Sequence, residues 1–382
     1  MKILWIYNLP LRPEAGGTER ITSLVAKGLS MRGHECMDIL VFNQNGNISY
    51  YDEPVRDVYQ FLKDNKVDIV INQIAYSRWL LADFLSKGGA RWHKEGGKII
   101  SCLHFDPKPA SNLYYQRNIR NKGFKDYINI AKAFLLYPYQ QKKQEQETGE
   151  IFNWIYDNSD WYITLSETHF PYFKKVTKRD DYSRLKAINN PLTFDDISDE
   201  SILLEKKKVV LVCSRMDEYQ KRISLVLKAW RKLQHYPESK GWTLKILGTG
   251  PDLERYKRFV SKHKIKNIEF KGQQSPEPYY READIFLMTS TGIEGWGLTL
   301  TESLQRGVVP IVMNTCSVYS DIIQNGHNGF LTKGSNLNDF VNHIKGLFSN
   351  ETRLRRMQHN ALKSSSRFTI VKTMDKWKEL VS

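Results

Sequence analysis

The sequence predicts an α/β fold of two domains, each built on a parallel sheet. Short apolar runs alternate along the chain with segments in which apolar residues recur at helical spacing, a pattern typical of parallel strands joined by helices. The length of 382 residues fits two domains, since one domain takes roughly 150–200 residues. We expect the first domain over residues 1–195 and the second over residues 205–360, with a polar linker between them.

The strands are predicted from apolar runs that end in polar, glycine or proline residues. In the first domain these runs are 2–7, 37–42, 68–72, 98–103 and 161–165, and in the second they are 209–213, 244–247, 268–272, 283–288 and 308–313. Helices are predicted at 55–63, 79–86, 223–233 and 299–305, and a last helical stretch covers about 350–380. Functional side chains of parallel sheets are expected at the carboxyl ends of the strands.

The composition is that of a globular protein with hydrophobic cores, since 41% of the residues are hydrophobic and 12% are aromatic. Four widely spaced cysteines, Cys36, Cys102, Cys213 and Cys316, match no metal-ligand spacing, which favours reduced thiols in a cytoplasmic protein. We expect no signal peptide and no membrane span, because no apolar run approaches about 18 residues. The chain also has no Asp-x-Asp pair, so we expect no carboxylate clamp for a divalent metal.

Basic residues are unevenly distributed in a chain whose net charge is +15. Residues 201–382 carry 30 Lys and Arg against 17 Asp and Glu, whereas residues 1–200 carry 27 against 25. Residues 108–143 hold eight basic residues against one acid, Asp126, interleaved with aromatic and aliphatic residues. Two interpretations of this segment stay open: an interfacial segment on an anionic bilayer, or a helical insertion with a solvated basic face.

The most informative stretch is 294–302, which reads Glu-Gly-Trp-Gly-Leu-Thr-Leu-Thr-Glu. It lies between a predicted strand and a predicted helix. Its glycines let backbone N–H groups approach a phosphate-bearing ligand at the helix N-terminus. Glu294 and Glu302 would repel phosphate, so we expect them to face neutral groups that offer hydroxyls, such as a sugar and a ribose. The structural alternative is an acid at the helix start and a solvated acid within the helix.

Other candidate residues follow other predicted strands. Gly16 and Gly17 lie in the loop after the first strand. This loop is not Gly-x-Gly-x-x-Gly, and no convincing acid follows the second strand, which argues against a dinucleotide enzyme. His104 directly follows the strand at 98–103. Arg215 and Lys221 lie between a strand and a helix, where a guanidinium fork and a point charge together suit a diphosphate.

Taken in their order along the chain, these motifs resemble those of the retaining glycosyltransferases of family 4, which have the GT-B fold. Residues 294–302 resemble the family's Glu-x7-Glu motif, residues 16–20 its Gly-Gly-x-Glu-Arg loop, and His104 its strand-end histidine. Residues 214–222 resemble Gly-Arg-x-x-x-x-Lys-Gly, although Ser214 and Arg222 replace the two flanking glycines. The resemblance implies two Rossmann-like domains that face each other across a cleft, with a final helix over 361–382 packing back on the first.

The resemblance also implies an activity: transfer of a sugar, with retained configuration, from a nucleotide-sugar to an acceptor hydroxyl. Arg215 and Lys221 would stabilise the leaving diphosphate, Glu302 would bind the ribose, and Glu294 would hold the donor sugar, which His104 would also contact. The remaining donor-binding residues implied are Gly295, Trp296, Gly297, Leu298, Thr299, Gly248, Gly16 and Gly17. UDP is the expected nucleotide and a glycan or lipid-linked glycan the expected acceptor, and no metal or other cofactor is expected.

Two other classes of function stay open at this point. The basic balance and the many aromatic residues would also suit a nucleic-acid-binding protein, although no zinc spacing, RNP motif or basic zipper supports one. The chain could also be a catalytically silent GT-B protein that docks at a membrane, and the presence of Arg215, Lys221, Glu294 and Glu302 argues against that. We therefore expect a cytoplasmic enzyme, located at the inner face of the cell membrane if the segment 108–143 binds lipid.

Overall fold

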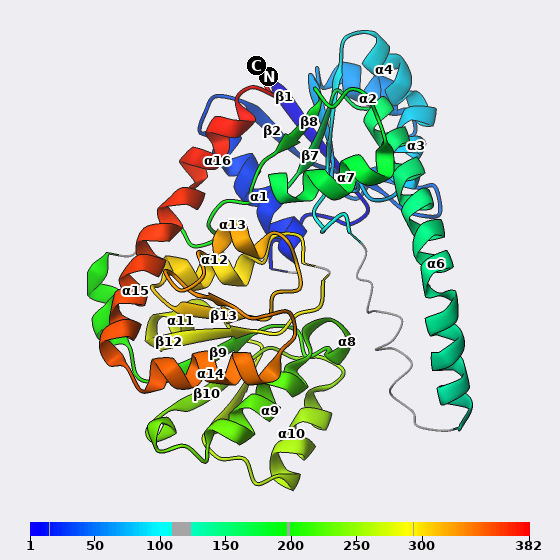
Figure 1. Cartoon of the computed structure of the whole chain (residues 1–382). Coiled ribbons are helices and arrows are strands. Elements are labelled where there is room, and N and C mark those ends of the chain that lie inside the picture. Colours follow the sequence, from blue (N-terminus) through cyan, green and yellow to red (C-terminus); the bar gives the residue numbers. More distant parts are fainter. Residues whose placement is uncertain (15, 109–123, 197–198, 293) are drawn as a thin grey trace. The chain divides into compact units, whose positions relative to one another are not determined.

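The computed structural model describes residues 1–14, 16–108, 124–196, 199–292 and 294–382, with the backbone alone over 124–136. The chain divides into two compact units (Figure 1). Unit 1 contains Met1–Lys108, Leu136–Thr193 and Phe368–Ser382, and unit 2 consists mainly of Phe194–Arg367. Each unit has its own largely parallel sheet, so the predicted α/β fold class is confirmed. The predicted cleft between two domains stays a prediction.

The described residues of unit 1 form a sheet in the order β4-β3-β2-β1-β5-β6-β7-β8. The strands are β1 (Lys2–Tyr7), β2 (Glu35–Phe42), β3 (Ile48–Tyr50), β4 (Glu53–Pro54), β5 (Ile69–Asn72), β6 (Lys98–Cys102), β7 (Trp161–Thr164) and β8 (Leu185–Ala187). Pairing is parallel from β2 through β8, while β3 and β4 add an antiparallel hairpin at one edge. The sequence analysis missed this hairpin, because strands of two or three residues are too short to show a period.

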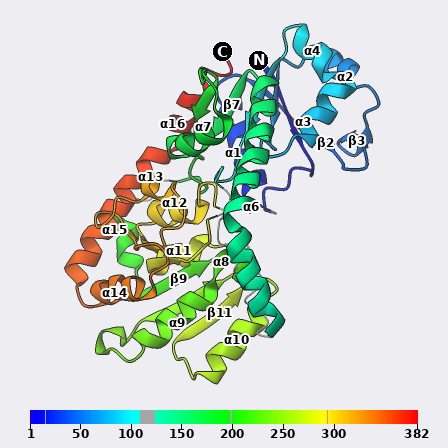
Figure 2. The ribbon, with the colours of Figure 1, turned by 45° about the vertical axis from the view of Figure 1, so that its right-hand side comes forward.

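Helices cover both faces of the unit 1 sheet (Figures 1 and 2). They are α1 (Gly17–Ser30), α2 (Val58–Asp64), α3 (Trp79–Phe84), η1 (Leu85–Gly89), α4 (Ala90–Lys94), α6 (Phe124–Asp157), η2 (Glu167–His169), α7 (Phe170–Thr177) and α16 (Ile370–Trp377). Leu4 and Ile6 of β1 belong to the core that includes residues of α2, α3 and α7, whereas Trp5 lies on the opposite face, beside α1. The apolar run of β1 is therefore continuous because both faces of the strand are buried.

The described residues of unit 2 form a fully parallel sheet in the order β11-β10-β9-β12-β13-β14. The strands are β9 (Val209–Cys213), β10 (Thr243–Leu247), β11 (Ile268–Gly272), β12 (Ala283–Met288), β13 (Val309–Val312) and β14 (Phe330–Leu331). The helices are η3 (Glu200–Glu205), α8 (Glu218–Lys221), α9 (Ile223–Leu233), η4 (Pro237–Ser239), α10 (Leu253–Lys262), α11 (Glu277–Glu282), α12 (Leu298–Gln305), α13 (Tyr319–Ile322), α14 (Leu337–Phe348), α15 (Glu351–Ser365) and η5 (Ser366–Phe368). Apolar faces of α9, α10 and α14 bury one side of the sheet.

The predicted final helix is two helices in the structure. α15 ends at Ser365, and α16 begins after Thr369, whose side chain accepts a hydrogen bond from the backbone of Lys372. A run of three serines and this N-cap threonine favour the interruption, because short hydroxyl side chains compete for backbone groups within a helix. α16 packs on α1 within unit 1, where a Cβ at Gly28 would lie 2.6 Å from the sulfur of Met374.

The basic segment 108–143 lies largely outside the residues whose side chains are described. Its last part belongs to α6, which contains Pro138. Further along α6, the side chains of Phe152, Ile155 and Tyr156 pack into the core of unit 1. Within the described part of the chain, we find no helix whose length and apolar character would let it span a bilayer. Neither interpretation of the segment is tested by these observations.

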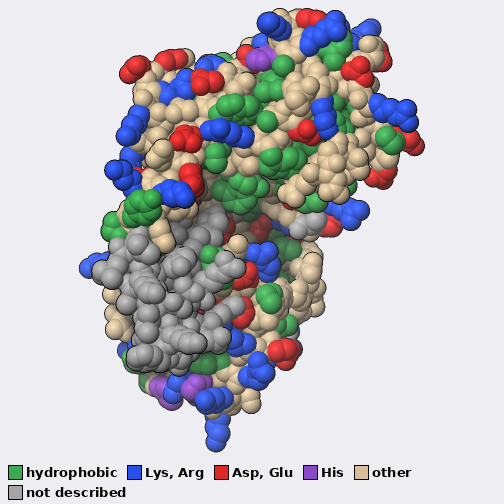
Figure 3. Space-filling view, turned by 90° about the vertical axis from the view of Figure 1, so that its right-hand side faces the viewer, with side chains coloured by type: hydrophobic (Ala, Val, Ile, Leu, Met, Phe, Trp, Pro, Cys, Tyr) green, Lys and Arg blue, Asp and Glu red, His purple; other side chains and the backbone are tan. Residues whose placement is uncertain are grey.

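Much of the basic excess lies on the solvent side of α9 and α10. Residues 223–267 hold 11 Lys and Arg against three acids, and Lys and Arg (blue) gather with His (purple) at the lower end of the face in Figure 3. Ten of these eleven basic residues are exposed, namely Lys228, Arg231, Lys232, Lys240, Arg255, Lys257, Arg258, Lys262, Lys264 and Lys266. A large part of the net charge is therefore a solvated helix face.

Lys206 links the ends of two helices from a position just before β9. Its ammonium donates hydrogen bonds to the carbonyl oxygens of Tyr280 at 3.1 Å and Arg306 at 2.7 Å. Burial lowers the pKa of Lys206 to about 7, against the opposing attraction of Asp284 and Glu205. Because an unfolded lysine titrates near 10.4, the unfolded state binds more protons than the folded state between these pH values.

We expect the wild-type protein to gain stability relative to a Lys206→Met variant as the pH rises from 7 to 9.5. The gain is up to about 1 kcal/mol per pH unit, because the cost of burying the charged amine disappears as the amine loses its proton. Urea unfolding at several pH values measures it, and the comparison of the two proteins cancels the other titrating groups. If the difference in the free energy of unfolding between the two proteins does not change with pH, the lowered pKa of Lys206 is contradicted.

Gly248 brings the loop after β10 against the loop after β9. Its φ is +120°, and a Cβ there would lie 2.0 Å from the carbonyl oxygen of Ser214. The backbone N–H of Met216 donates to Thr249 O at 2.8 Å, and that of Asp252 donates to Met216 O at 3.0 Å. The glycine is needed both for its backbone conformation and for the close approach of the two loops.

We expect Gly248→Ala to lower the free energy of unfolding more than Gly272→Ala does. Both glycines have positive φ, so both substitutions cost roughly 1–2 kcal/mol of backbone strain. A Cβ at position 272 would meet no atom within 4 Å, whereas one at position 248 collides with backbone. Urea unfolding measures both losses, and equal losses would show that the contact with Ser214 is unimportant.

Candidate active site

Most of the candidate residues lie where the strand order of the unit 2 sheet reverses. The chain runs from β9 outward to β10 and β11, then returns to add β12 on the other side of β9. The loops that follow β9 and β12 therefore separate at their carboxyl ends, which is where open parallel sheets bind ligands. Arg215 and Lys221 come from the loop after β9, and Glu294 to Gly297 come from the loop after β12.

The loop after β9 is ordered by its own hydrogen bonds. The carboxylate of Asp217 accepts from the backbone N–H groups of Tyr219 and Gln220 and so caps the short helix α8. The guanidinium of Arg215 is hydrogen-bonded to the side chain of Gln220 and lies 3.6 Å from Asp217. The Arg215 side chain is still 58% exposed, so the fork remains accessible to a ligand.

Lys221 and Glu294 form an ion pair that joins the two loops. Thr289 Oγ1 donates to the carbonyl of Lys221 at 2.8 Å, and the N–H of Thr291 donates to the carbonyl of Gln220 at 2.7 Å. The two charged side chains are only 22% and 19% exposed. The structure therefore brings together two residues that lie 73 positions apart in the sequence.

The ion pair keeps Glu294 ionised. Burial alone would raise the pKa of Glu294, but the charge and hydrogen bond of Lys221, a hydrogen bond from Ser290 and the charge of Arg215 together lower it. Glu294 is thus a carboxylate at neutral pH and can only accept hydrogen bonds. A carboxylate is able to accept hydrogen bonds from hydroxyls and repels phosphate, so the role expected for Glu294 stays a prediction.

Arg222 ends α8 in a backbone conformation that is usually adopted by glycine. Its φ of +47° is left-handed, the conformation that a glycine adopts most easily. The buried guanidinium donates to the carbonyl oxygens of Thr289 and Ser290, each at 2.8 Å, and to Ser335 Oγ at 2.9 Å. Arg222 therefore holds the carboxyl end of β12 in place, while Lys221 faces Glu294.

The loop after β12 leads into α12 through a glycine turn. Gly295, Trp296 and Gly297 are all buried, and Gly297 caps the helix with a left-handed φ of +81°. Leu298 and Thr299 form the first turn of α12, and the carbonyl of Thr299 accepts from Tyr280 Oη at 3.2 Å. Glu302 follows one turn later and is 2% exposed. The alternative of a solvated acid within the helix is therefore wrong for Glu302.

Three candidate residues belong to unit 1, whose strand order reverses between β1 and β5. Gly16 caps α1 in an extended conformation, and a Cβ there would lie 2.4 Å from the carboxylate of Glu19. Gly17 is the first residue of α1. His104 follows β6, and its Nε2 is hydrogen-bonded to Oε1 of Gln73, which follows β5. The candidates thus form one group in each unit.

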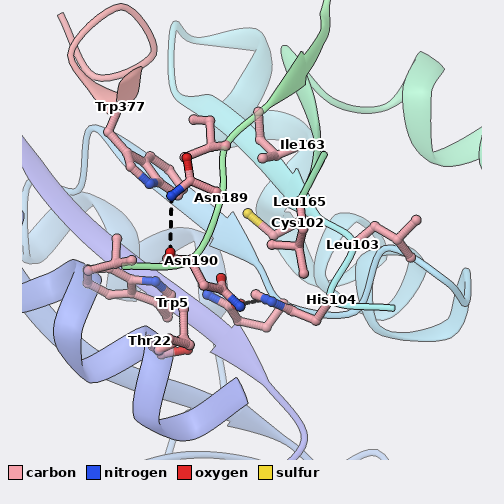
Figure 4. A pocket seen from close by; sticks show the side chains of 14 residues that line it. Trp5, Thr22, Cys102, Leu103, His104, Ile163, Leu165, Asn189, Asn190 and Trp377 are labelled. Carbon is pink, nitrogen blue, oxygen red and sulfur yellow. Dashed lines mark hydrogen bonds between the residues drawn. The ribbon is translucent and has the colours of Figure 1, made fainter. Parts of the chain in front are cut away.

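His104 borders a small cavity between the unit 1 sheet, α1 and α16 (Figure 4). The cavity measures about 20 Å³, enough for about one water molecule. None of its lining side chains carries a formal charge; they are Trp5, Ile21, Thr22, Val25, Gln73, Cys102, Leu103, His104, Ile163, Leu165, Ile188, Asn189, Asn190 and Trp377. Burial in these surroundings lowers the pKa of His104 to about 4, so the ring is neutral at physiological pH.

Sequence reasoning missed the side chains that orient the candidate residues. Gln220 and Ser290 contact Arg215 and Glu294, and Gln73 contacts His104. Gln73 offered a usable signal, because it follows its strand directly, as His104 does. In the described part of the chain, no group of three or more His, Cys, Asp or Glu side chains is placed to hold a metal ion.

Comparison with known proteins shows that part of the chain is similar to a described family. Residues 193–364 match the family model of the glycosyl transferases group 1. An uncharacterised glycosyltransferase of Haemophilus influenzae is 23% identical over 375 residues, covering 96% of each chain. The lipopolysaccharide 1,6-galactosyltransferase of Salmonella typhimurium is 23% identical, covering 59% of this chain and 66% of its own length. The poly(glycerol-phosphate) alpha-glucosyltransferase of Bacillus subtilis is 24% identical, covering 72% of this chain and 38% of its own.

Solved structures share the fold over the whole chain. Anabaena HepE, crystallised with UDP and glucose, gives a TM-score of 0.69 at 16% identity, covering 100% of this chain and 99% of HepE. The lipopolysaccharide outer core galactosyltransferase WaaB gives 0.67 at 20% identity with the same coverage. The region that matches the glycosyl transferases group 1 model therefore contains Arg215, Lys221, Glu294 and Glu302, in a chain that shares the GT-B fold of these solved structures.

Proposed function

We propose that the chain is a retaining hexosyltransferase that moves a sugar from a UDP-sugar to a hydroxyl of a glycan or lipid-linked glycan. The observation that carries this proposal is the Lys221–Glu294 ion pair beside the Gly297 turn. There a cation, a carboxylate and a helix N-terminus converge at the strand-order reversal of a group 1 domain. This combination suits a ligand that is anionic in one part and rich in hydroxyls in the next.

The cationic half of the site would bind the diphosphate of the donor. Arg215 supplies a planar fork that binds phosphate oxygens in pairs, and Lys221 supplies a point charge. When the glycosidic bond breaks, negative charge grows on the departing diphosphate, so both cations stabilise the transition state more than the bound substrate. Since these side chains provide the positive charge, we propose that the reaction needs no metal cofactor.

The carboxylate half would bind the neutral parts of the donor. Glu294 accepts hydrogen bonds from hydroxyls of the transferred sugar, and the buried Glu302 accepts them from the ribose. Backbone N–H groups of Gly295, Trp296 and Gly297 bind the sugar or the phosphate, with Leu298 and Thr299 beside them and Gly248 behind Arg215. We propose that His104, Gly16 and Gly17, which belong to unit 1, also contact the donor.

The choice of UDP, retention and a glycan acceptor is supported by similar proteins and by the motif. The similar structures include HepE with UDP and glucose, and a pneumococcal O-GlcNAc transferase, GtfA, with UDP and GlcNAc. The named relatives include a lipopolysaccharide galactosyltransferase and a poly(glycerol-phosphate) glucosyltransferase. The spacing of Glu294 and Glu302 resembles the motif of retaining enzymes. We therefore propose a role in cell-surface polysaccharide synthesis.

We further propose that the enzyme works in the cytoplasm, at the inner face of the cell membrane. All four cysteines are free thiols, which fits a reducing compartment. The eight basic residues of 108–143, interleaved with aromatic ones, suit a surface of anionic lipid near a lipid-linked acceptor.

We expect UDP to raise the melting temperature of the protein in the presence of EDTA, and Arg215→Ala to weaken UDP binding roughly tenfold or more. The loss follows from removing charge-assisted hydrogen bonds of about 1.5–3 kcal/mol. Titration calorimetry gives the affinity. Arg258→Ala is the matched control, because Arg258 is exposed on α10 in the same unit. Equal affinity of both variants, or a strict need for added metal, would contradict the proposed phosphate site.

We expect Glu294→Gln to lower the turnover of the preferred UDP-sugar by roughly a hundredfold or more while the fold is retained. The amide keeps the shape but loses the charge that pairs with Lys221 and orients the sugar. UDP release in the presence of acceptor measures the turnover. Glu254→Gln is the control, because Glu254 is a largely exposed acid on α10. Near-normal turnover of Glu294→Gln would defeat the assignment.

A further inference from the structure

Gln73 and His104 form a side-chain pair at the carboxyl ends of two neighbouring strands in unit 1. Gln73 directly follows β5, and its backbone N–H donates to the carbonyl of Ile6 on β1 at 3.2 Å. Its side chain is buried, and its Oε1 is hydrogen-bonded to Nε2 of His104. The imidazole is therefore held from one side by a neutral amide.

A buried polar chain fixes the turn that carries Gln73. The fully buried Asn72 donates from Nδ2 to Ser101 Oγ at 3.1 Å and accepts at Oδ1 from the N–H of Ile74 at 3.0 Å. Ser101 Oγ in turn lies 2.8 Å from Ser159 Oγ. These bonds connect β5 with β6 below the pair, so Gln73 and His104 are positioned by the sheet itself and not by a free loop.

The pairing determines which ring nitrogen of His104 carries the proton. An amide oxygen only accepts hydrogen bonds, so Nε2 must be the donor and Nδ1 must be bare. Within the described residues, Nδ1 has no hydrogen-bond partner. The neutral ring thus presents an unused acceptor beside a cavity without charged groups. A bare ring nitrogen of this kind accepts a hydrogen bond from a hydroxyl.

We infer that Gln73 is a positioning residue that fixes His104 as the acceptor for one hydroxyl of the sugar substrate. The identity of the ligand as a sugar rests on the proposed function, whereas the tautomer follows from the pair alone. Recognition of that hydroxyl then depends on Gln73, although Gln73 acts only through His104. A bound sugar that lacks the hydroxyl would leave Nδ1 without a partner.

The first test is the tautomer of His104 in the full chain, read from nitrogen-15 NMR of its imidazole and assigned with a His104→Asn variant. We expect the Nε2–H form in the wild-type protein and a mixture of tautomers in Gln73→Met, which keeps the length but has no acceptor. Gln60→Met makes the same change at an exposed position of unit 1 and should leave the signal unchanged. A wild-type ring protonated at Nδ1, or a Gln73→Met spectrum identical to wild type, would overturn the inference.

The second test uses the UDP-hexose that supports turnover and its analogues that each lack one hydroxyl. In the wild-type enzyme, one deoxy analogue should lose tenfold or more in kcat/KM. In Gln73→Met, kcat/KM for the parent donor should fall by a similar factor. Removing the hydroxyl from the donor should then lower the kcat/KM of this variant little further, because both changes remove the same hydrogen bond. Additive losses would refute the link between Gln73 and the hydroxyl. Absence of turnover with every donor would refute the proposed function, and the NMR result would still decide the tautomer.

Discussion

The ion pair between Lys221 and Glu294 is the interaction on which the candidate site of unit 2 depends. Two charges that are each about one fifth exposed must satisfy one another, because an isolated buried charge would be neutralised or would destabilise the fold. The pair also ties the loop after β9 to the loop after β12. Neither loop is rigid by length or composition, so the charge pair and the backbone bonds to Thr289 and Thr291 define their geometry.

Backbone conformation is the second constraint on this site. Gly248 and Gly297 both have positive φ, and each stands where a loop turns sharply toward the same edge of the sheet. Gly248 lets the loop behind Arg215 approach within contact of Ser214, and Gly297 caps the N-terminus of α12. Arg222 meets the same demand without being a glycine, because its guanidinium forms three hydrogen bonds that offset the strain of a left-handed residue.

The sequence was sufficient to predict the parallel sheets and most of the strands. β1 and β9 were predicted at their observed bounds, because a strand that is buried on both faces appears in the sequence as a continuous apolar run. The edge hairpin β3–β4 and the break between α15 and α16 were not predicted, because short edge strands and caps depend on neighbours that a single sequence does not reveal. The same limit applies to contacts: Lys221 and Glu294 were each identified from local pattern, but their pairing across 73 positions is a product of strand order.

The two units use the same architecture to present opposite kinds of chemistry. In each, the sheet reverses its strand order; the candidate side chains of unit 2 follow the strands on either side of the reversal, whereas Gln73 and His104 follow two neighbouring strands, β5 and β6, on one side of it. Unit 2 places charged groups there, Arg215, Lys221 and Glu294, whereas unit 1 places the neutral pair of Gln73 and His104 beside an uncharged cavity. Under the proposed function, the cations Arg215 and Lys221 would bind the diphosphate, which is common to all donors, and Glu294 would bind hydroxyls of the sugar. A neutral acceptor with a fixed tautomer contributes less to affinity and more to selectivity, because it forms its hydrogen bond only with a hydroxyl at one position of the sugar. Under the proposed function, selection among sugars therefore depends on Glu294 in unit 2 and on the pair of Gln73 and His104 in unit 1.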